Sequence, residues 1–286
     1  MNESKDFCFC TLAVGERYRQ HTKMLAQDIQ QYTPNISLCV LTDYPDDFQE
    51  FPQVMAFKHQ LKSVNGYHDK RFVLDKALSL FESCMFIDSD VRILGNFFRE
   101  MNWSLGITAR AGCSLINHMK SLNNPHKTKT IQEVSQKLNI DLQKVQWFHE
   151  FMFVMRRQDG LETEFFALWQ NIAYFFEMRG IYNSEGVVMG LAAAKLGIDI
   201  GFFRDDIIPF FKDNIESVRI KQGQSALEEK KQYFDIHEEI EHPQRSLMTK
   251  IIGILTEKTV FLYRVLRLRF MIITDADFQS FIKMSQ

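Results

Sequence analysis

An α/β fold, in which helices flank a mostly parallel sheet, is what this sequence predicts. Short apolar runs of strand length alternate with segments of helical spacing as far as about residue 90. Turn-forming residues separate these segments, and neither an internal repeat nor a low-complexity tract interrupts them. A helix that crosses between two strands lets both run in the same direction, so repeated strand–helix units build a parallel sheet.

The first half of the chain contains four predicted strands. Each is a short apolar run that ends at turn-forming residues. The strands are predicted at residues 7–14, 36–41, 54–57 and 84–87, and the helices between them at 18–32 and 69–81. Ligands bind such sheets at the carboxyl ends of the strands. Thr11, Asp43 and Asp88 all stand at or near these ends.

The second half is less regular. Further strands are predicted at residues 103–108, 148–155 and 233–237, and helices at 131–138, 160–178 and 184–196. Residues 246–270 form a long basic amphipathic segment. It is compatible with an anionic membrane surface, and equally with a helix packed on the domain with a solvated basic face, the interpretation that we favour. We therefore expect one domain over residues 1–245 and a helical C-terminal extension over 246–286.

Composition limits the classes of function. The net charge of −2 provides no basic field that would attract nucleic acid. Five cysteines are an odd number, and most stand in or beside apolar runs, which favours reduced, buried thiols. The polar start does not resemble a secretory signal, and no apolar run reaches the roughly 20 residues of a membrane span. We expect a cytoplasmic protein that is soluble or bound only to the surface of a membrane.

The most informative motif is a pair of acids at the end of an apolar strand. Asp88 and Asp90 follow the run Cys-Met-Phe-Ile and are separated only by Ser89. Carboxylates are costly to bury alone, so this position predicts a compensating partner: a metal, a basic side chain or the amides of a turn. We favour a hard divalent cation. An ordinary Asp-rich turn has the same appearance.

Two reactions use paired acids at a strand tip. In one, a metal held by the acids grips the diphosphate of a nucleotide-sugar while the sugar departs. In the other, that of haloacid-dehalogenase-type aspartyl phosphatases, the first Asp attacks phosphorus. Thr108 and residues 204–206 supply fragments of the phosphatase pattern. That enzyme carries its motif on the first strand, however, whereas Asp88 follows the fourth.

The chain resembles glycosyltransferases of the GT-A fold, a Rossmann-like architecture, and most closely glycosyltransferase family 8 and its relatives. The resemblance covers roughly residues 7–242 and is strongest over 67–93, which read Tyr-His-Asp-Lys-Arg-Phe-Val-Leu-Asp-Lys-Ala-Leu and then Phe-Ile-Asp-Ser-Asp-Val-Arg-Ile. It implies an enzyme of the hexosyltransferase type that uses Mn²⁺ or Mg²⁺. Its partners would be a UDP- or GDP-sugar and a hydroxyl acceptor on a glycan, a lipid or a small molecule.

The same resemblance implies where the donor binds. An Arg on the helix before the paired acids would reach the donor, and Arg71 stands at that distance, with Lys70 as a less certain neighbour. Arg71 could instead pair with Asp75 on the same helix face. Asp90 would ligate the metal directly, while Asp88 would bridge to the metal or the ribose, with Ser89 between them. Thr11 and Asp43 match the surroundings of the base and ribose.

The remaining site residues are acids and histidines from later segments. Glu185, at a predicted helix start, is a candidate catalytic or sugar-binding acid, and its alternative is a helix-capping role. Glu150 is a second candidate of the same kind. His237 and His242 are alternatives for a third metal ligand, because family relatives bring a His to the metal from near the end of the domain. The family's following Gly and Lys-Pro-Trp pattern is absent.

These inferences lead to a metal-dependent glycosyltransferase as the predicted function. The alternatives are the aspartyl phosphatase and a catalytically inactive transferase fold that binds a nucleotide or a partner protein. Peripheral membrane contact through the basic C-terminal segment is compatible with each of them.

Overall fold

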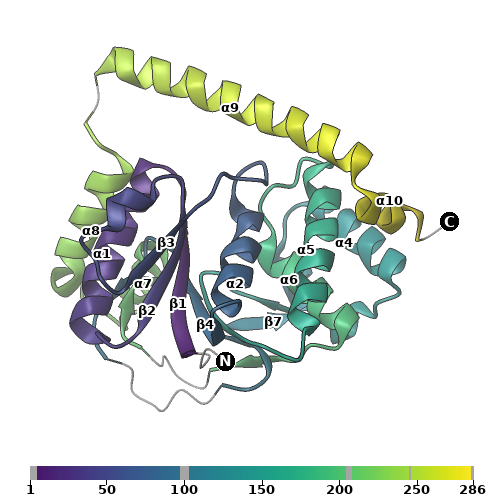
Figure 1. The fold of residues 1–286 in the computed structure, drawn as a ribbon, viewed down its shortest axis with the longest axis horizontal. Helices are drawn as coiled ribbons and strands as arrows, with labels where there is room; N and C mark the ends of the chain where they lie inside the picture. Colours follow the sequence, from purple (N-terminus) through teal and green to yellow (C-terminus); the bar gives the residue numbers. More distant parts are fainter. Residues whose placement is uncertain (1–4, 97–102, 204–207, 245, 285–286) are drawn as a thin grey trace.

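A seven-stranded sheet forms the central layer of the part of the chain that is described, residues 5–96, 103–203, 208–244 and 246–284 of a computed structural model (Figure 1). Its strands are β1 (Lys5–Ala13), β2 (Ser37–Thr42), β3 (Val54–Lys58), β4 (Phe81–Ile87), β6 (Gly106–Ala109), β9 (Met152–Arg156) and β10 (Ile200–Phe202). The strand order is β10-β6-β9-β4-β1-β2-β3. The strands pair in parallel, except that β9 is antiparallel to both β4 and β6. The predicted α/β class is confirmed.

The order of the strands reverses next to β1. From β1 the chain continues outward to β2 and β3, then returns to place β4 on the other side of β1. At such a switch point the connections leave the carboxyl ends of neighbouring strands in opposite directions, which opens a crevice where ligands bind. The paired acids follow the β4 strand, so they stand at this crevice.

Helices cover both faces of the sheet. They include α1 (Glu16–Tyr32) on one face and α2 (Lys70–Leu78), α5 (Leu161–Glu177) and α6 (Glu185–Leu196) on the other (Figure 1). Alternate residues of β1 point to the two cores: Phe9 packs with Leu25 of α1, whereas Cys10 packs toward α2. The five cysteines are free thiols, and four are buried.

The remaining elements are short strands and peripheral helices. They are η1 (Pro45–Phe48), η2 (Tyr67–Asp69), β5 (Arg92–Ile93), β7 (Gly112–Ser114), α3 (Leu115–Ser121), α4 (Pro125–Leu138), η3 (Leu142–Lys144), β8 (Gln146–Phe148), β11 (Phe210–Phe211), α7 (Asp213–Lys221), α8 (Leu227–Glu241), α9 (Leu247–Thr274) and α10 (Ala276–Lys283).

Two predicted strands differ in the structure. The segment 233–237 lies within the helix α8, where Phe234 packs edge-on against Phe211 with ring centroids 4.9 Å apart. A short apolar run has no period long enough to separate strand from helix, which is why the prediction was wrong. The segment 148–155 is divided by a turn between β8 and β9, and this turn carries Glu150.

The C-terminal helices pack on the domain only in part. Phe278 and Phe281 of α10 contact Tyr174 and Phe175 of α5, and the last turns of α9 bury Leu268 and Ile272. The first half of α9 is exposed, whereas its C-terminal end packs on the domain. No helix among the described residues is both long enough and apolar enough to cross a membrane.

Candidate functional site

A cavity of about 470 Å³ opens at the switch point. Its walls come from the ends of β1 and β4, the start of α2, the β8–β9 turn, the start of α6, and the helices α7 and α8. Seven of the predicted site residues line it, namely Lys70, Asp88, Ser89, Asp90, Glu150, Glu185 and His237. Residues far apart in the sequence therefore meet at the ligand-binding edge of the sheet.

Lys70 is the buried cation of this cavity. Its Nζ lies 3.0 Å from Asp88 Oδ1 and 3.2 Å from Glu185 Oε1, and it donates to the backbone carbonyl of Glu150 at 3.2 Å. Burial alone would lower the pKa of Lys70, but the charges of Asp88, Glu185 and Glu150 raise it well above its usual value. Lys70 therefore stays protonated and holds three acidic residues around one positive charge.

Lys212 is a second cation, which the sequence did not reveal. Its Nζ lies 2.6 Å from Asp90 Oδ1 and 3.3 Å from Asp88 Oδ2. It reaches the acids because the antiparallel pair of β11 and β5 places Phe211 opposite Arg92. Burial would raise the pKa of Asp88, yet Lys70 and Lys212 together bring it below its usual value. Asp88 is therefore ionised between two ammonium groups.

Glu150 and Glu185 form an acidic pair in the wall of the same cavity. Burial and the nearby charge of Glu185 raise the pKa of Glu150 to about 7. Glu185 is the first residue of α6, and its Oε2 accepts a hydrogen bond from the Ser184 amide at 3.2 Å. A carboxyl with a pKa of about 7 can both take up and release a proton near neutral pH, so Glu150 is suited to general acid–base catalysis.

Glycines let α6 pack against β8 closely enough to bring Glu185 next to Glu150. A Cβ on Gly190 would lie 2.1 Å from the carbonyl oxygen of Gln146, and a Cβ on Gly186 would lie 2.3 Å from that of Phe148. Since these neighbours are backbone atoms of β8, they have no rotamer by which to move away.

Replacing Gly190 with Ala is therefore expected to lower the free energy of unfolding by about 1 to 3 kcal/mol, because the helix must move off the strand. Chemical denaturation measures this change. Gly253→Ala is the matched control, because that helical glycine has open space around it. The control should stabilise the protein by about 0.5 to 1 kcal/mol. Equal effects of the two substitutions would contradict the packing argument.

A possible metal centre lies beside the ion pairs. Asp90, Asp213 and His237 each offer a ligand atom, and these atoms lie within 4.8 Å of one another. His21, His237 and Glu241 form a second such group, in which His21 Nε2 is 3.0 Å from Glu241 Oε1. His242 is different: it is 71% exposed at the end of α8 and lies near Glu238 instead of the cavity. Of the two candidate histidines, the structure brings only His237 to the acids.

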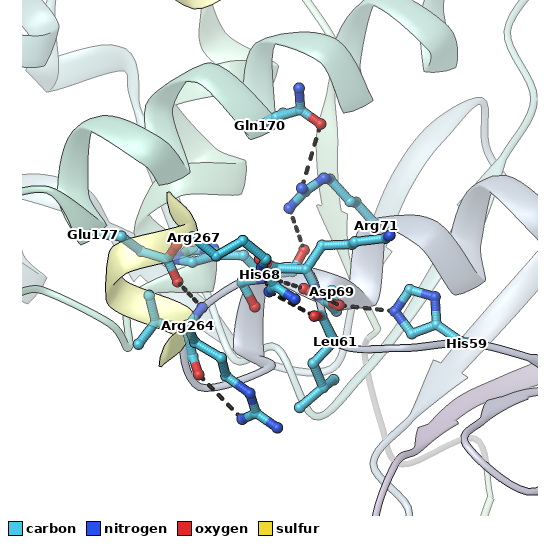
Figure 2. Close-up of polar contacts among 12 residues, drawn as sticks. His59, Leu61, His68, Asp69, Arg71, Gln170, Glu177, Arg264 and Arg267 are labelled. Atoms are coloured by element: carbon cyan, nitrogen blue, oxygen red, sulfur yellow. Dashed lines mark hydrogen bonds and ion pairs between the residues drawn. The ribbon is translucent and has the colours of Figure 1, made fainter. Parts of the chain in front are cut away.

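Arg71 does not reach the cavity. Its guanidinium is buried on the other side of α2, where it donates to the His68 carbonyl at 2.7 Å and lies 3.4 Å from Gln170 Oε1 (Figure 2). Successive helical residues point about 100° apart, so Lys70 and Arg71 cannot both face the acids. The prediction that Arg71 contacts the donor is therefore corrected, because its guanidinium makes these buried hydrogen bonds outside the cavity.

Thr11 and Asp43 also lie away from the cavity lining. Thr11 is fully buried within β1, and its Oγ1 has no hydrogen-bond partner among the described residues. Asp43 accepts from the Gly15 amide at 3.0 Å and pairs with Arg19 at 2.7 Å. Gly15 has a φ of 104°, a conformation that favours glycine, so Asp43 secures the sharp β1–α1 turn at the cavity edge. Leu12 and Val14 line the cavity in place of Thr11.

The loop before α2 is fastened by a buried polar network (Figure 2). Asp69 accepts from the amides of Lys62 and Ser63 at 2.6 and 2.7 Å, and Glu177 Oε1 accepts from the Val64 amide at 2.9 Å. Burial is the main reason that the pKa of Glu177 rises to about 7 from the ordinary value of 4.5. The network holds Leu61, Asn65 and Gly66 in the cavity wall.

The raised pKa of Glu177 predicts a pH-dependent stability. Because the folded protein binds this proton more tightly than the unfolded chain, the contribution of Glu177 to stability is fully present below pH 4.5 and is lost as pH rises to 7 and above. The loss amounts to at most about 3 kcal/mol. Relative to wild type, Glu177→Gln should gain this stability over that interval in denaturation measurements. Glu164→Gln, at an exposed position of the same helix, should not. Parallel pH profiles for wild type and Glu177→Gln would contradict the expectation.

Comparison with known proteins gives little further identification. No family profile matches this chain, and no curated protein matches it. Among solved structures, the chain is similar to the apo form of WbbM, described as a bifunctional glycosyltransferase, with 11% identity and a TM-score of 0.45. The match covers 71% of this chain and 39% of that one, so this chain spans about two fifths of that protein. Similarity at this level assigns neither a family nor a function.

Proposed function

We propose that this protein is a metal-dependent glycosyltransferase, of the hexosyltransferase type, that moves a sugar from a nucleotide-diphosphate-sugar to a hydroxyl acceptor. The observation that supports this most strongly is the position of Asp88 and Asp90. They stand at the switch point of a mostly parallel sheet, in the wall of a cavity of about 470 Å³. Nucleotides bind such crevices, and acids there suit a cation that meets phosphate.

The donor atoms fit a divalent cation. Five carboxyls line the cavity against three cations, Arg17, Lys70 and Lys212, which leaves an acidic excess; the carboxyls are those of Asp88, Asp90, Glu150, Glu185 and Glu241. Asp90, Asp213 and His237 would hold the ion. Carboxylate and imidazole together suit Mn²⁺ better than Mg²⁺, which prefers oxygen ligands alone. When bound, such an ion neutralises the charge that develops on a departing diphosphate.

The protein's own residues would supply the rest of the chemistry. Lys70 keeps a positive charge at the tip of β4, where it orients Asp88 and Glu185. Glu150, with its pKa of about 7, can exchange a proton with the acceptor hydroxyl near neutral pH. Glu185, at the start of α6, would hold sugar hydroxyls beside it. The half-exposed Tyr67 forms part of the same wall and offers a surface for a base or sugar ring.

A second candidate is a nucleotide-binding protein of the same architecture without turnover or metal dependence. The ion pair of Lys212 with Asp90 at 2.6 Å favours it, because this lysine already provides the charge that a metal would supply. The phosphatase has less support. Asp88 follows β4 and not the first strand, and the downstream acidic fragment, residues 204–206, lies outside the described residues.

A screen of UDP- and GDP-sugars tests the proposal. The expected result is a Mn²⁺-dependent hydrolysis or thermal stabilisation by one donor. Stabilisation by a nucleotide that is equal with and without metal, and without hydrolysis, would favour the second candidate. Phosphate release from a phosphomonoester, with fluoroberyllate trapped on Asp88, would establish the phosphatase instead.

A further inference from the structure

The helix α9 presents an apolar face that nothing in the described structure covers. Its side chains recur three and four residues apart, so they form one stripe along the helix. They are between 46% and 73% exposed: Met248, Ile251, Ile252, Leu255, Leu262, Tyr263, Leu266, Phe270 and Ile273. The 28-residue helix is about 42 Å long. An exposed apolar surface this extended is typical of a binding site.

The opposite face of α9 is attached to the domain along the C-terminal half of the helix. Leu268 and Ile272 are buried, Arg264 donates to the Val64 carbonyl, and Arg267 donates to the carbonyls of Leu61 and Lys62 (Figure 2). These anchors fix which side of the helix points away from the protein. In Figure 1, α9 runs along the outside of the domain. The apolar stripe is therefore a positioned surface of the folded protein.

The charges of α9 identify the chemistry of the partner. The helix carries five basic residues and one acidic residue, although the whole chain has a net charge of −2. Lys250, Lys258 and Arg269 are exposed. By helical position, Lys258 and Arg269 border the apolar stripe. Apolar side chains flanked by cations are complementary to acyl chains beneath anionic headgroups.

We propose that the outward face of α9 binds the surface of an anionic lipid bilayer, with the helix axis in the plane of the interface. The apolar stripe enters the boundary between headgroups and acyl chains, and the basic residues contact the phosphates. The hydrogen bonds from Arg264 and Arg267 to the carbonyls of residues 61–64 then place the cavity wall next to the bilayer, because Leu61 lines the cavity. This inference is independent of the chemistry in the cavity.

Vesicle sedimentation with the full chain tests the inference. We expect binding to vesicles of phosphatidylcholine with about one third phosphatidylglycerol, weaker binding at high salt, and little binding to phosphatidylcholine alone. The double variant Leu255→Glu with Leu262→Glu should reduce partitioning at least about tenfold. Lys258→Gln with Arg269→Gln should reduce it about fivefold for each charge removed. All these side chains are exposed, so thermal unfolding should be unchanged.

The matched control is Leu105→Glu, because this substitution makes the same change at another exposed leucine, before β6. It should bind vesicles as the wild type does. Equal binding of the Leu255/Leu262 double variant and wild type would overturn the proposal, as would an absence of binding to anionic vesicles. A dimer in light scattering that the double variant dissociates, without vesicle binding by wild type, would assign the face to a second copy of the chain.

Discussion

Asp90→Asn is expected to reduce sugar transfer at least about 10³-fold, measured at saturating Mn²⁺ with the donor identified in the screen. Asp90 meets both the Lys212 ammonium group and the proposed metal ligands Asp213 and His237. The amide keeps the shape of the side chain and removes the anionic ligand. The loss should appear mainly in kcat, because charge develops on the leaving group as the reaction proceeds.

The variant Asp213→Asn distinguishes the loss of a metal ligand from the loss of the ion pair with Lys212. This residue belongs to the same ligand group but has no ion pair with Lys212. If a metal acts, the Asp213 variant should require more Mn²⁺ for half-maximal rate, and His237→Gln should behave likewise. His242→Gln is the control, because His242 lies outside the cavity. Full activity of a folded Asp90→Asn protein would contradict the proposed role of the acids.

Lys70→Met is expected to lower the free energy of unfolding at neutral pH by about 3 to 5 kcal/mol. Methionine fills a similar volume, but Asp88 and Glu185 lose the ammonium group that lies 3.0 and 3.2 Å from them. Asp88 keeps the Lys212 ammonium group at 3.3 Å, so the buried Glu185 carboxylate is the group that loses its ion-pair partner, and such a group gains a proton in its place. The deficit should therefore shrink as pH falls, because protonation removes the negative charge that the variant leaves unpaired.

Chemical denaturation at several pH values measures this effect. Lys76→Met serves as the control on the same helix, because Lys76 contacts the Phe57 ring and not the cavity acids. It should cost far less and show no recovery in acid. A Lys70→Met deficit that is small, or constant from neutral to acidic pH, would mean that Lys70 is not the counter-ion of the acids.

Local sequence patterns were sufficient to predict the sheet and part of the candidate site. The βα alternation and the apolar run before Asp88 are properties of short sequence windows, and both predict the edge of the sheet where the cavity lies. Glu185 was identified because it begins a helix with a clear start and a Gly197 stop. Lys70 was named only as a neighbour of Arg71, because the sequence does not show which of two adjacent helical residues faces a strand tip.

The parts that were missed depend on contacts between distant segments. Lys212 meets Asp90 only because β11 pairs with β5, and two-residue strands leave no recognisable pattern. Helix α8 brings His237 to the acids, although its apolar run resembled a strand. The exposed stripe of α9 follows from where Arg264 and Arg267 attach, which no helical periodicity reveals.

Calorimetric titration of UDP and GDP into the wild-type protein, with Mn²⁺ and with EDTA, tests the central claim most directly. The proposal predicts that one of the two nucleotides binds with Mn²⁺, loses at least about tenfold in affinity in EDTA, and shows no Mn²⁺ effect in Asp90→Asn. Binding that is equally tight in EDTA, or unchanged in that variant, would contradict it.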